Sequence, residues 1–146
     1  MFKKMKENKK TGFTLVELIV VLVILAILAA LLIPALTGYI DRAKKKSVIA
    51  ETRQAVMAAQ TIVDEEYAKL TDGSTIKELG DATGFTAKAI QDLSEVKGTV
   101  NSVTVENGKI ATLEYNDGSK TCTYNPANNG VDTNPNSDGD YNVEDN

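Results

Sequence analysis

One carboxylate stands at the start of a long apolar segment, and it is the residue whose position most needs a chemical explanation. Glu17 is the single charged residue between positions 13 and 40. A carboxylate inside a bilayer costs on the order of 2.5 kcal/mol or more. Glu17 therefore either reaches water at the membrane interface or meets a positive partner that self-assembly supplies.

The remaining sequence lacks the usual residues of an active site. The 146 residues include no His, and Cys122 is the only cysteine. The chain thus has no His general base, no His or multi-Cys zinc site and no internal disulfide. Because Cys122 has apolar neighbours in a strand pattern, we expect a small buried hydrophobe rather than a redox group. The sequence predicts a non-enzymatic protein whose length allows one domain.

Charge and apolarity are segregated along the chain. Residues 1–12 have a net charge of +4 and residues 41–46 a net charge of +3, while the chain from Ser47 onward is acidic. Between the two basic segments lie 23 uncharged residues, Leu18 to Ile40. As a helix at ~1.5 Å per residue, this run spans roughly 35 Å, enough to cross a hydrocarbon core of about 30 Å. The sequence therefore predicts a membrane-spanning helix.

Two other interpretations of the basic and apolar segments are less favoured, namely a cleaved secretory signal at the start of the chain and a nucleic-acid binding site in the second basic segment. A cleaved secretory signal has a shorter apolar core, of about 7 to 15 residues, and ends at a small-residue cleavage site. The basic run Arg42–Lys46 has the composition of a membrane interface. With an acidic segment after it, this run does not argue for binding to nucleic acid.

The apolar positions become periodic after Asp41, and they predict the second half of one long helix. Their spacings are seven, seven, four and three, as expected for one helical stripe that packs on a globular part, at Ile49, Val56, Val63, Tyr67 and Leu70. Turn residues from Thr71 to Ser74 end the pattern. We expect a helix over residues 13–70, with a kink or a locally unwound stretch at Pro34 and Gly38.

Three strand patterns follow, over residues 99–106, 109–115 and 120–124, with Asn-Gly and Asp-Gly turns between them. They predict a three-stranded antiparallel meander. A three-residue first turn with a bulge at Gly108 is favoured, because it brings four apolar residues to one face, namely Val103, Val105, Ala111 and Leu113. In the preceding connection, a short helix is expected over residues 87–95, with Thr86 as its N-cap.

The final segment, residues 125–146, has seven Asn, four Asp and no Lys or Arg. We expect a solvated loop or a disordered end. A weaker alternative is a calcium loop, because glycine stands sixth and a carboxylate twelfth in the spacing of such loops, with candidate ligands Asn134, Asn136, Asp138, Asp140 and Asp145. The first position is Asn and the last is Asp rather than Glu, so no metal site and no cofactor is assigned.

The start of the chain resembles the prepilin signature of type IV pilins and pseudopilins. Lys9-Lys10-Thr11-Gly12 precedes Phe13-Thr14-Leu15-Val16-Glu17 and the apolar run, with Pro34 in its second half. The match covers residues 1 to about 45. It implies that a membrane-embedded prepilin peptidase cuts between Gly12 and Phe13 and methylates the new amine of Phe13. It also implies that Glu17 pairs with the cationic N-terminus of a neighbouring subunit.

The resemblance implies an α+β, pilin-like fold with a long N-terminal helix packed on a small antiparallel sheet. The expected segments are a leader that is removed (residues 1–12), the assembly half of the helix (13–40) and its amphipathic half (41–70). A connection (71–98), the sheet (99–125) and a polar tail (126–146) follow. Phe13, Glu17, Pro34 and Gly38 are the expected assembly residues. The missing disulfide suggests a Gram-positive source or another way of holding the tail.

The function that the resemblance implies is that of a structural subunit. Such a subunit waits in the cytoplasmic membrane, and an assembly platform and ATPase pack it into a homo-oligomeric helical filament at the cell surface, for adhesion, surface motility or biofilm formation. One alternative is a pseudopilin of a type II secretion or DNA-uptake apparatus. The other is a monomeric binding module on an uncleaved membrane anchor.

Overall fold

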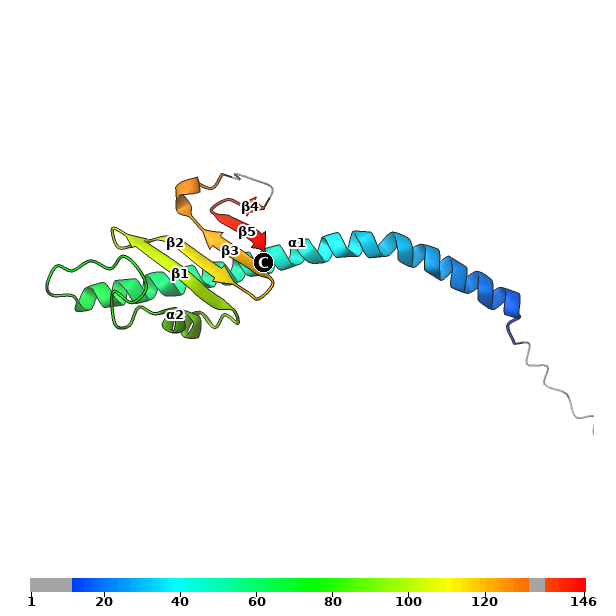
Figure 1. The fold of residues 1–146 in the computed structure, drawn as a ribbon, viewed down its shortest axis with the longest axis horizontal. Helices are drawn as coiled ribbons and strands as arrows, with labels where there is room; N and C mark the ends of the chain where they lie inside the picture. Colours follow the sequence, from blue (N-terminus) through cyan, green and yellow to red (C-terminus); the bar gives the residue numbers. More distant parts are fainter. Residues whose placement is uncertain (1–11, 132–135) are drawn as a thin grey trace, which may run out of the picture. The chain divides into compact units, whose positions relative to one another are not determined.

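The computed structural model describes residues 12–131 and 136–146. The chain divides into two compact units, residues 1–41 and residues 42–146, and the second unit is called the head below. The long helix α1 (Leu15–Lys69) begins in the first unit and ends in the head (Figure 1). Residues 12–40 are exposed throughout, so the described part of the first unit has no core of its own.

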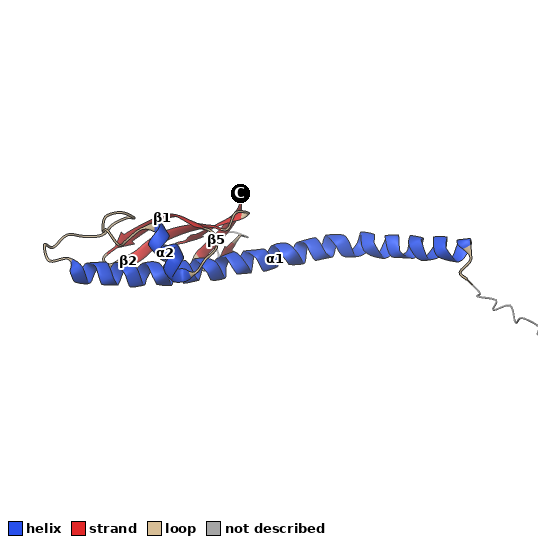
Figure 2. Cartoon of the chain, turned by 90° about the horizontal axis from the view of Figure 1, so that it is seen from below, coloured by secondary structure: helices blue, strands red, loops and turns tan. Residues whose placement is uncertain are grey.

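The head consists of the second half of α1, a short helix and a five-stranded antiparallel sheet. The sheet order is β1-β2-β3-β5-β4, with strands β1 (Thr99–Glu106), β2 (Lys109–Asn116), β3 (Lys120–Tyr124), β4 (Ser137–Asp138) and β5 (Tyr141–Asp145). Helix α2 (Ala87–Ser94) precedes β1, and the 3-10 helix η1 (Pro126–Asn128) follows β3. Figure 2 shows the sheet lying along one side of α1. This arrangement confirms the predicted α+β, pilin-like fold.

Several of the buried side chains of α1 in the head are small. Thr52, Ala55 and Ala59 have no exposed surface and belong to the same core region as Leu113 and Tyr115 of β2. The larger side chains of the strands, with Leu113 and Tyr115 among them, fill the space beside these small residues. The predicted apolar stripe of α1 is partly correct. Ile49 and Val63 are buried in the core, whereas Val56, Tyr67 and Leu70 are only partly buried and pack against it.

The first hairpin differs from the prediction. Glu106 pairs directly with Lys109, so the turn contains only Asn107 and Gly108. Both have a positive φ, 51° and 77°, as a type I′ turn requires, and this turn matches the twist of the flanking strands. The predicted bulge at Gly108 is therefore wrong. The register instead shifts twice inside the strands, at Asn101 of β1 and, nearer the turn, at Ala111 of β2.

The register shift at Ala111 brings apolar residues of β1 and β2 to one face of the sheet. Val103 pairs with Leu113 and Val105 pairs with Ile110, and all four side chains are buried. Ile110 thus takes the place that was predicted for Ala111. A bulge changes the alternation of side chains between the two faces by one residue. The predicted bulge at Gly108 was favoured for the same reason, because it would also bring four apolar side chains to one face.

The tail is not a loop, because two further strands form within it. Strand β5 pairs along its whole length with β3, and its central residue Val143 is buried opposite Cys122. Lys120, which is almost fully buried, forms an ion pair with Asp145. The terminal Asn146 donates its backbone N–H to the carbonyl oxygen of Ser119, at 3.1 Å. The expected three-stranded meander is therefore a five-stranded sheet, and the expected solvated tail is wrong for residues 137–145.

The short helix agrees with the prediction. It covers Ala87–Ser94, and the side-chain oxygen of Thr86 accepts a hydrogen bond from the backbone N–H of Ala89, at 3.1 Å. This bond satisfies one of the free N–H groups of the first turn. Glu95 has a φ of 57° and ends the helix in the left-handed region.

The hydroxyl of Tyr115 joins three segments of the head, and its removal is expected to destabilise the fold. This hydroxyl donates to Glu51 at 2.7 Å and accepts the backbone N–H of Gly98 at 2.8 Å. Tyr115→Phe leaves both groups without this partner, so the free energy of unfolding should fall by about 1–3 kcal/mol. Urea unfolding of the full chain in detergent measures the change. Tyr124→Phe is the control, because the Tyr124 hydroxyl has no hydrogen bond within the described residues, and equal losses in both variants would contradict the prediction.

The single thiol should be unreactive in the folded protein. Cys122 has no exposed surface, and burial raises the pKa of its thiol to about 11. Because alkylation requires an accessible thiolate, iodoacetamide at pH 8 should leave the native mass unchanged and should add one group after unfolding in urea. Intact mass spectrometry reads both states. Equal rates in the native and unfolded protein would show that the thiol is accessible.

Candidate functional site

The candidate site begins at the first described residues of the chain. Gly12, Phe13 and Thr14 precede α1 and have no regular secondary structure. The side chain of Phe13 is 81% exposed, and a Cβ atom added at Gly12 would have no atom within 4 Å. The peptide bond between Gly12 and Phe13 is therefore sterically open to an enzyme.

Thr14 and Glu17 form a reciprocal cap at the start of α1. The Glu17 carboxylate accepts the backbone N–H of Thr14 at 3.0 Å, and the Thr14 hydroxyl oxygen accepts the backbone N–H of Glu17 at 3.2 Å. This is a capping box, in which two free N–H groups at the helix start are satisfied by side chains. This role of Thr14 was not predicted from the sequence, although the T-x-x-E spacing of Thr14 and Glu17 is a known signal for a capping box.

The cap gives Glu17 a local partner but does not neutralise its charge. The Thr14 N–H is a neutral donor, so the carboxylate keeps a net charge at the edge of the apolar run. A carboxylate near a helix N-terminus is favoured by the helix dipole, by roughly 0.3–1 kcal/mol. That gain is smaller than the cost of a charge in a bilayer, which is on the order of 2.5 kcal/mol or more. Glu17 can therefore still gain from a cationic partner.

The apolar half of α1, residues 15–40, has no partner in its own unit. All of these residues are exposed, and the large side chains among them are 45–74% exposed. Within the part of the chain that the structure describes, α1 is the one helix long and apolar enough to cross a membrane. An apolar surface of this size marks a membrane or an assembly interface.

Pro34 and Gly38 lie inside this apolar half without interrupting it. The backbone is helical at every residue of Leu15–Lys69, so the alternative of a locally unwound stretch is not observed. Pro34 has no N–H to donate to the preceding turn. The hydroxyl of Thr37 donates to the carbonyl oxygen of Ile33 at 2.8 Å, so this polar side chain is satisfied within the helix.

Comparison with known families identifies the N-terminal segment. Residues 8–33 match the family described as the prokaryotic N-terminal methylation motif. The match covers the Gly12–Phe13 bond, the cap and most of the apolar half, and it accompanies the long helix and antiparallel sheet described above. This N-terminal methylation motif, together with the long N-terminal helix and the antiparallel sheet, is that of the type IV pilin and pseudopilin superfamily. No solved structure matches the chain.

The methylation motif and the pilin-like fold have general consequences for the chain. The methylation motif implies processing by a prepilin peptidase and assembly into a filament-type system. The hydrophobic helix with this motif indicates membrane anchoring before assembly into an extracellular structure. Members of the pilin-like family are typically non-enzymatic structural subunits. The basic leader residues 1–11 lie outside the described residues.

The candidate calcium ligands of this pilin-like chain are arranged along a hairpin. Asp138 is the last residue of β4 and Asp140 lies in the turn between β4 and β5, while Asp145 is the last residue of β5. Asp140 accepts the N–H of Gly130 at 2.7 Å, and Asp145 pairs with Lys120. Asn134 lies outside the described residues. No group of three His, Cys, Asp or Glu side chains in residues 12–131 and 136–146 is placed to hold a metal ion.

One residue of the basic run contacts the tail. Lys45 donates to the side-chain oxygen of Asn136 at 3.3 Å. Its neighbours Arg42, Lys44 and Lys46 are exposed at the start of the head. The structure thus places a calcium-loop candidate, Asn136, beside a cation of α1.

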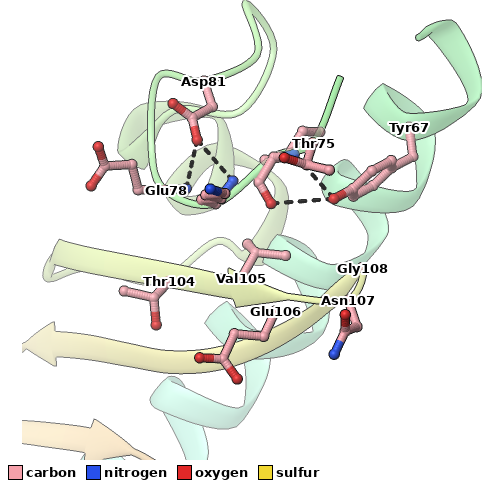
Figure 3. Close-up of a pocket in the computed structure, with 11 residues that line it drawn as sticks. Tyr67, Thr75, Glu78, Asp81, Thr104, Val105, Glu106, Asn107 and Gly108 are labelled. Carbon is pink, nitrogen blue, oxygen red and sulfur yellow. Dashed lines mark hydrogen bonds between the residues drawn. The ribbon is translucent and has the colours of Figure 1, made fainter. Parts of the chain in front are cut away.

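A cleft of the head, with a volume of about 1100 Å³, lies between the end of β1 and the loop that follows α1 (Figure 3). The Tyr67 hydroxyl accepts the N–H of Ile76 at 3.0 Å and donates to its carbonyl oxygen at 3.2 Å. Asp81 accepts the N–H groups of Lys77 and Glu78, and these bonds lower the pKa of its carboxyl. These hydrogen bonds of Tyr67 and Asp81 hold the loop that forms one wall of the cleft.

Proposed function

We propose that this protein is a type IV pilin, the structural subunit of a surface filament. The observation that carries the proposal is the apolar half of α1, which is exposed along its whole length and holds one charge, Glu17. Such a helix is stable in a membrane, or in a bundle of like helices. A subunit that moves from the first environment to the second can leave the membrane without exposing this surface to water.

Processing would create the positively charged group that pairs with Glu17, which the uncut chain does not have. Cleavage between Gly12 and Phe13 would remove the leader and leave an amine on Phe13, and methylation keeps that amine cationic. Pairing of Glu17 with the N-terminus of a neighbour neutralises both charges. Because an unpaired charge is costly in an apolar bundle, this pairing favours one axial register between subunits.

The other proposed roles follow from the same assembly. Pro34 and Gly38 weaken the helix locally and give the packed bundle slack that can extend under load. The head presents the polar face of its sheet to solvent, with exposed residues such as Thr104 and Glu106. We assign adhesion, surface motility or biofilm formation to this surface, and insertion into the filament to a separate assembly platform and ATPase.

The first test of this proposal is the mass of the protein recovered from sheared cell-surface material. The expected product begins at Phe13, carries one added methyl group and contains the 134 residues from Phe13 to Asn146. Gly12→Val places a branched side chain where the peptidase must approach the backbone, so this variant should keep its leader and stay in the membrane. Electron microscopy of the parent should show long filaments outside the cell.

Thr11→Val is the matched control, since it places the same side chain one residue before the cleavage position and should still be processed. A parent protein that still begins at Met1 would contradict both processing and the filament, and would favour a membrane-anchored binding module. A processed protein without extracellular filaments would favour the pseudopilin of a secretion or DNA-uptake apparatus.

The second test separates the two roles of Glu17. Glu17→Gln keeps a side-chain oxygen that accepts the Thr14 N–H, since Gln also serves in a capping box, but it removes the charge. Glu17→Ala removes both. If charge pairing controls assembly, both variants should be processed and both should lack surface filaments. Filament counts per cell and N-terminal sequencing measure the outcome, and normal assembly of Glu17→Gln would show that capping is the role of this residue.

A further inference from the structure

Three large apolar side chains of the head are exposed, within the part of it that the structure describes. They are Met57, Leu93 and Val131, with exposed fractions of 69%, 54% and 60%. Isolated exposed apolar residues are normal on protein surfaces. These three are different because two of them share one groove and the third stands on an ordered turn elsewhere on the head.

The groove lies between α1 and α2 and contains Met57 and Leu93. Its volume is about 340 Å³, and none of its lining residues is charged. The other residues that line it are Gln54, Ala58, Thr61 and Ser94. Depletion of charged residues is typical of the core of a protein interface, and methionine is enriched there. Apolar and small polar side chains thus form an open site for one apolar side chain.

The turn that carries Val131 is held in place by hydrogen bonds. The N–H of Val131 donates to the carbonyl oxygen of Asn128 at 3.0 Å, and the N–H of Gly130 donates to the Asp140 carboxylate at 2.7 Å. Gly139 packs beside Gly130, where an added Cβ would lie 3.6 Å from the Gly130 Cα atom. An apolar side chain on a preorganised turn loses little conformational freedom when it binds. The segment from Ala127 to Val131 is also uncharged.

The groove and the turn lie at opposite edges of the sheet. Helix α2 packs on β1, the strand at one edge. The segment that carries Val131 connects β3 to β4, the strand at the other edge. Figure 1 shows α2 below the sheet and the orange turn above it. One head therefore cannot join these two surfaces to each other, but two heads in the same orientation can.

We propose that the groove between α1 and α2 receives Val131 of a second copy of this chain. This inference rests on the proposed function and specifies where adjacent heads meet in the assembly. An interface between two different surfaces of one chain is heterologous, and when it does not close into a ring it generates a helical filament. The Met57 and Leu93 side chains would then be covered on each subunit that has a neighbour on that side.

The test is a covalent cross-link between the two surfaces. A chain with Met57→Cys and Val131→Cys, produced at full length in cells that process and assemble the parent, is oxidised with copper phenanthroline. The expected result is a ladder of dimers, trimers and longer covalent multimers on a non-reducing gel of whole-cell extract. A disulfide requires Cβ atoms about 3.5–4.5 Å apart, so the ladder reports direct contact. Whole-cell extract contains short and long assemblies alike.

Matched controls show whether the cross-link is specific. Each single-cysteine variant should form no ladder, because neither surface meets its own copy. The parent, whose Cys122 is fully buried, should form none either. Met57→Cys combined with Thr99→Cys, at an exposed position outside both surfaces, should also remain monomeric. A second measurement uses Val131→Asp, which should lose surface filaments while its processed form remains in the membrane, and Thr99→Asp, which should assemble normally.

The outcomes separate this interface from the proposed function. Filaments of the parent without a ladder in the double variant, or normal assembly of Val131→Asp, would overturn the interface and leave the pilin proposal intact. A cross-linked product whose mass is not a multiple of this chain would also overturn it, by identifying a different occupant of the groove. A parent that forms no assembly of any length would contradict the proposed function itself.

Discussion

The rest of this structure depends on one constraint, which is that residues 15–40 form an apolar helix that nothing in their own unit covers. Removing apolar surface from water gains about 25 cal/mol per Å², so a helix of this length cannot remain solvated. It must lie in lipid or against other copies. The basic segments on either side and the polar head are consistent with a chain that occupies both environments in turn.

In the second half of the same helix, the head covers the residues that would otherwise be exposed to water. There the small residues Thr52, Ala55 and Ala59 are fully buried, and larger side chains of β2, Leu113 and Tyr115, fill the core beside them. The C-terminal segment completes the sheet without a disulfide, by a full strand pairing with β3 and an ion pair between Lys120 and Asp145. This is the other way of holding the tail that the absence of a disulfide left open.

The start of α1 shows how two physical roles can share one residue. Glu17 caps the helix with Thr14, which explains its position within the first turn. Capping alone does not explain a charge, since a glutamine would serve there as well. The charge fits an assembly in which an N-terminal amine becomes available after processing. The two roles are compatible, because the two oxygen atoms of a carboxylate can accept hydrogen bonds from a backbone N–H and from a cation at the same time.

The sequence by itself determined the long helix, its apolar half, the short helix at Thr86 and three of the strands, because each depends on local periodicity, capping and turn residues. The same local signals gave the N-terminal motif. Only the tertiary structure decided the position of the bulge at Ala111 and the pairing of β5 with β3. Both depend on contacts between residues distant in sequence, and a single buried residue, Val143, is too weak a signal to predict a strand among so many Asn and Asp.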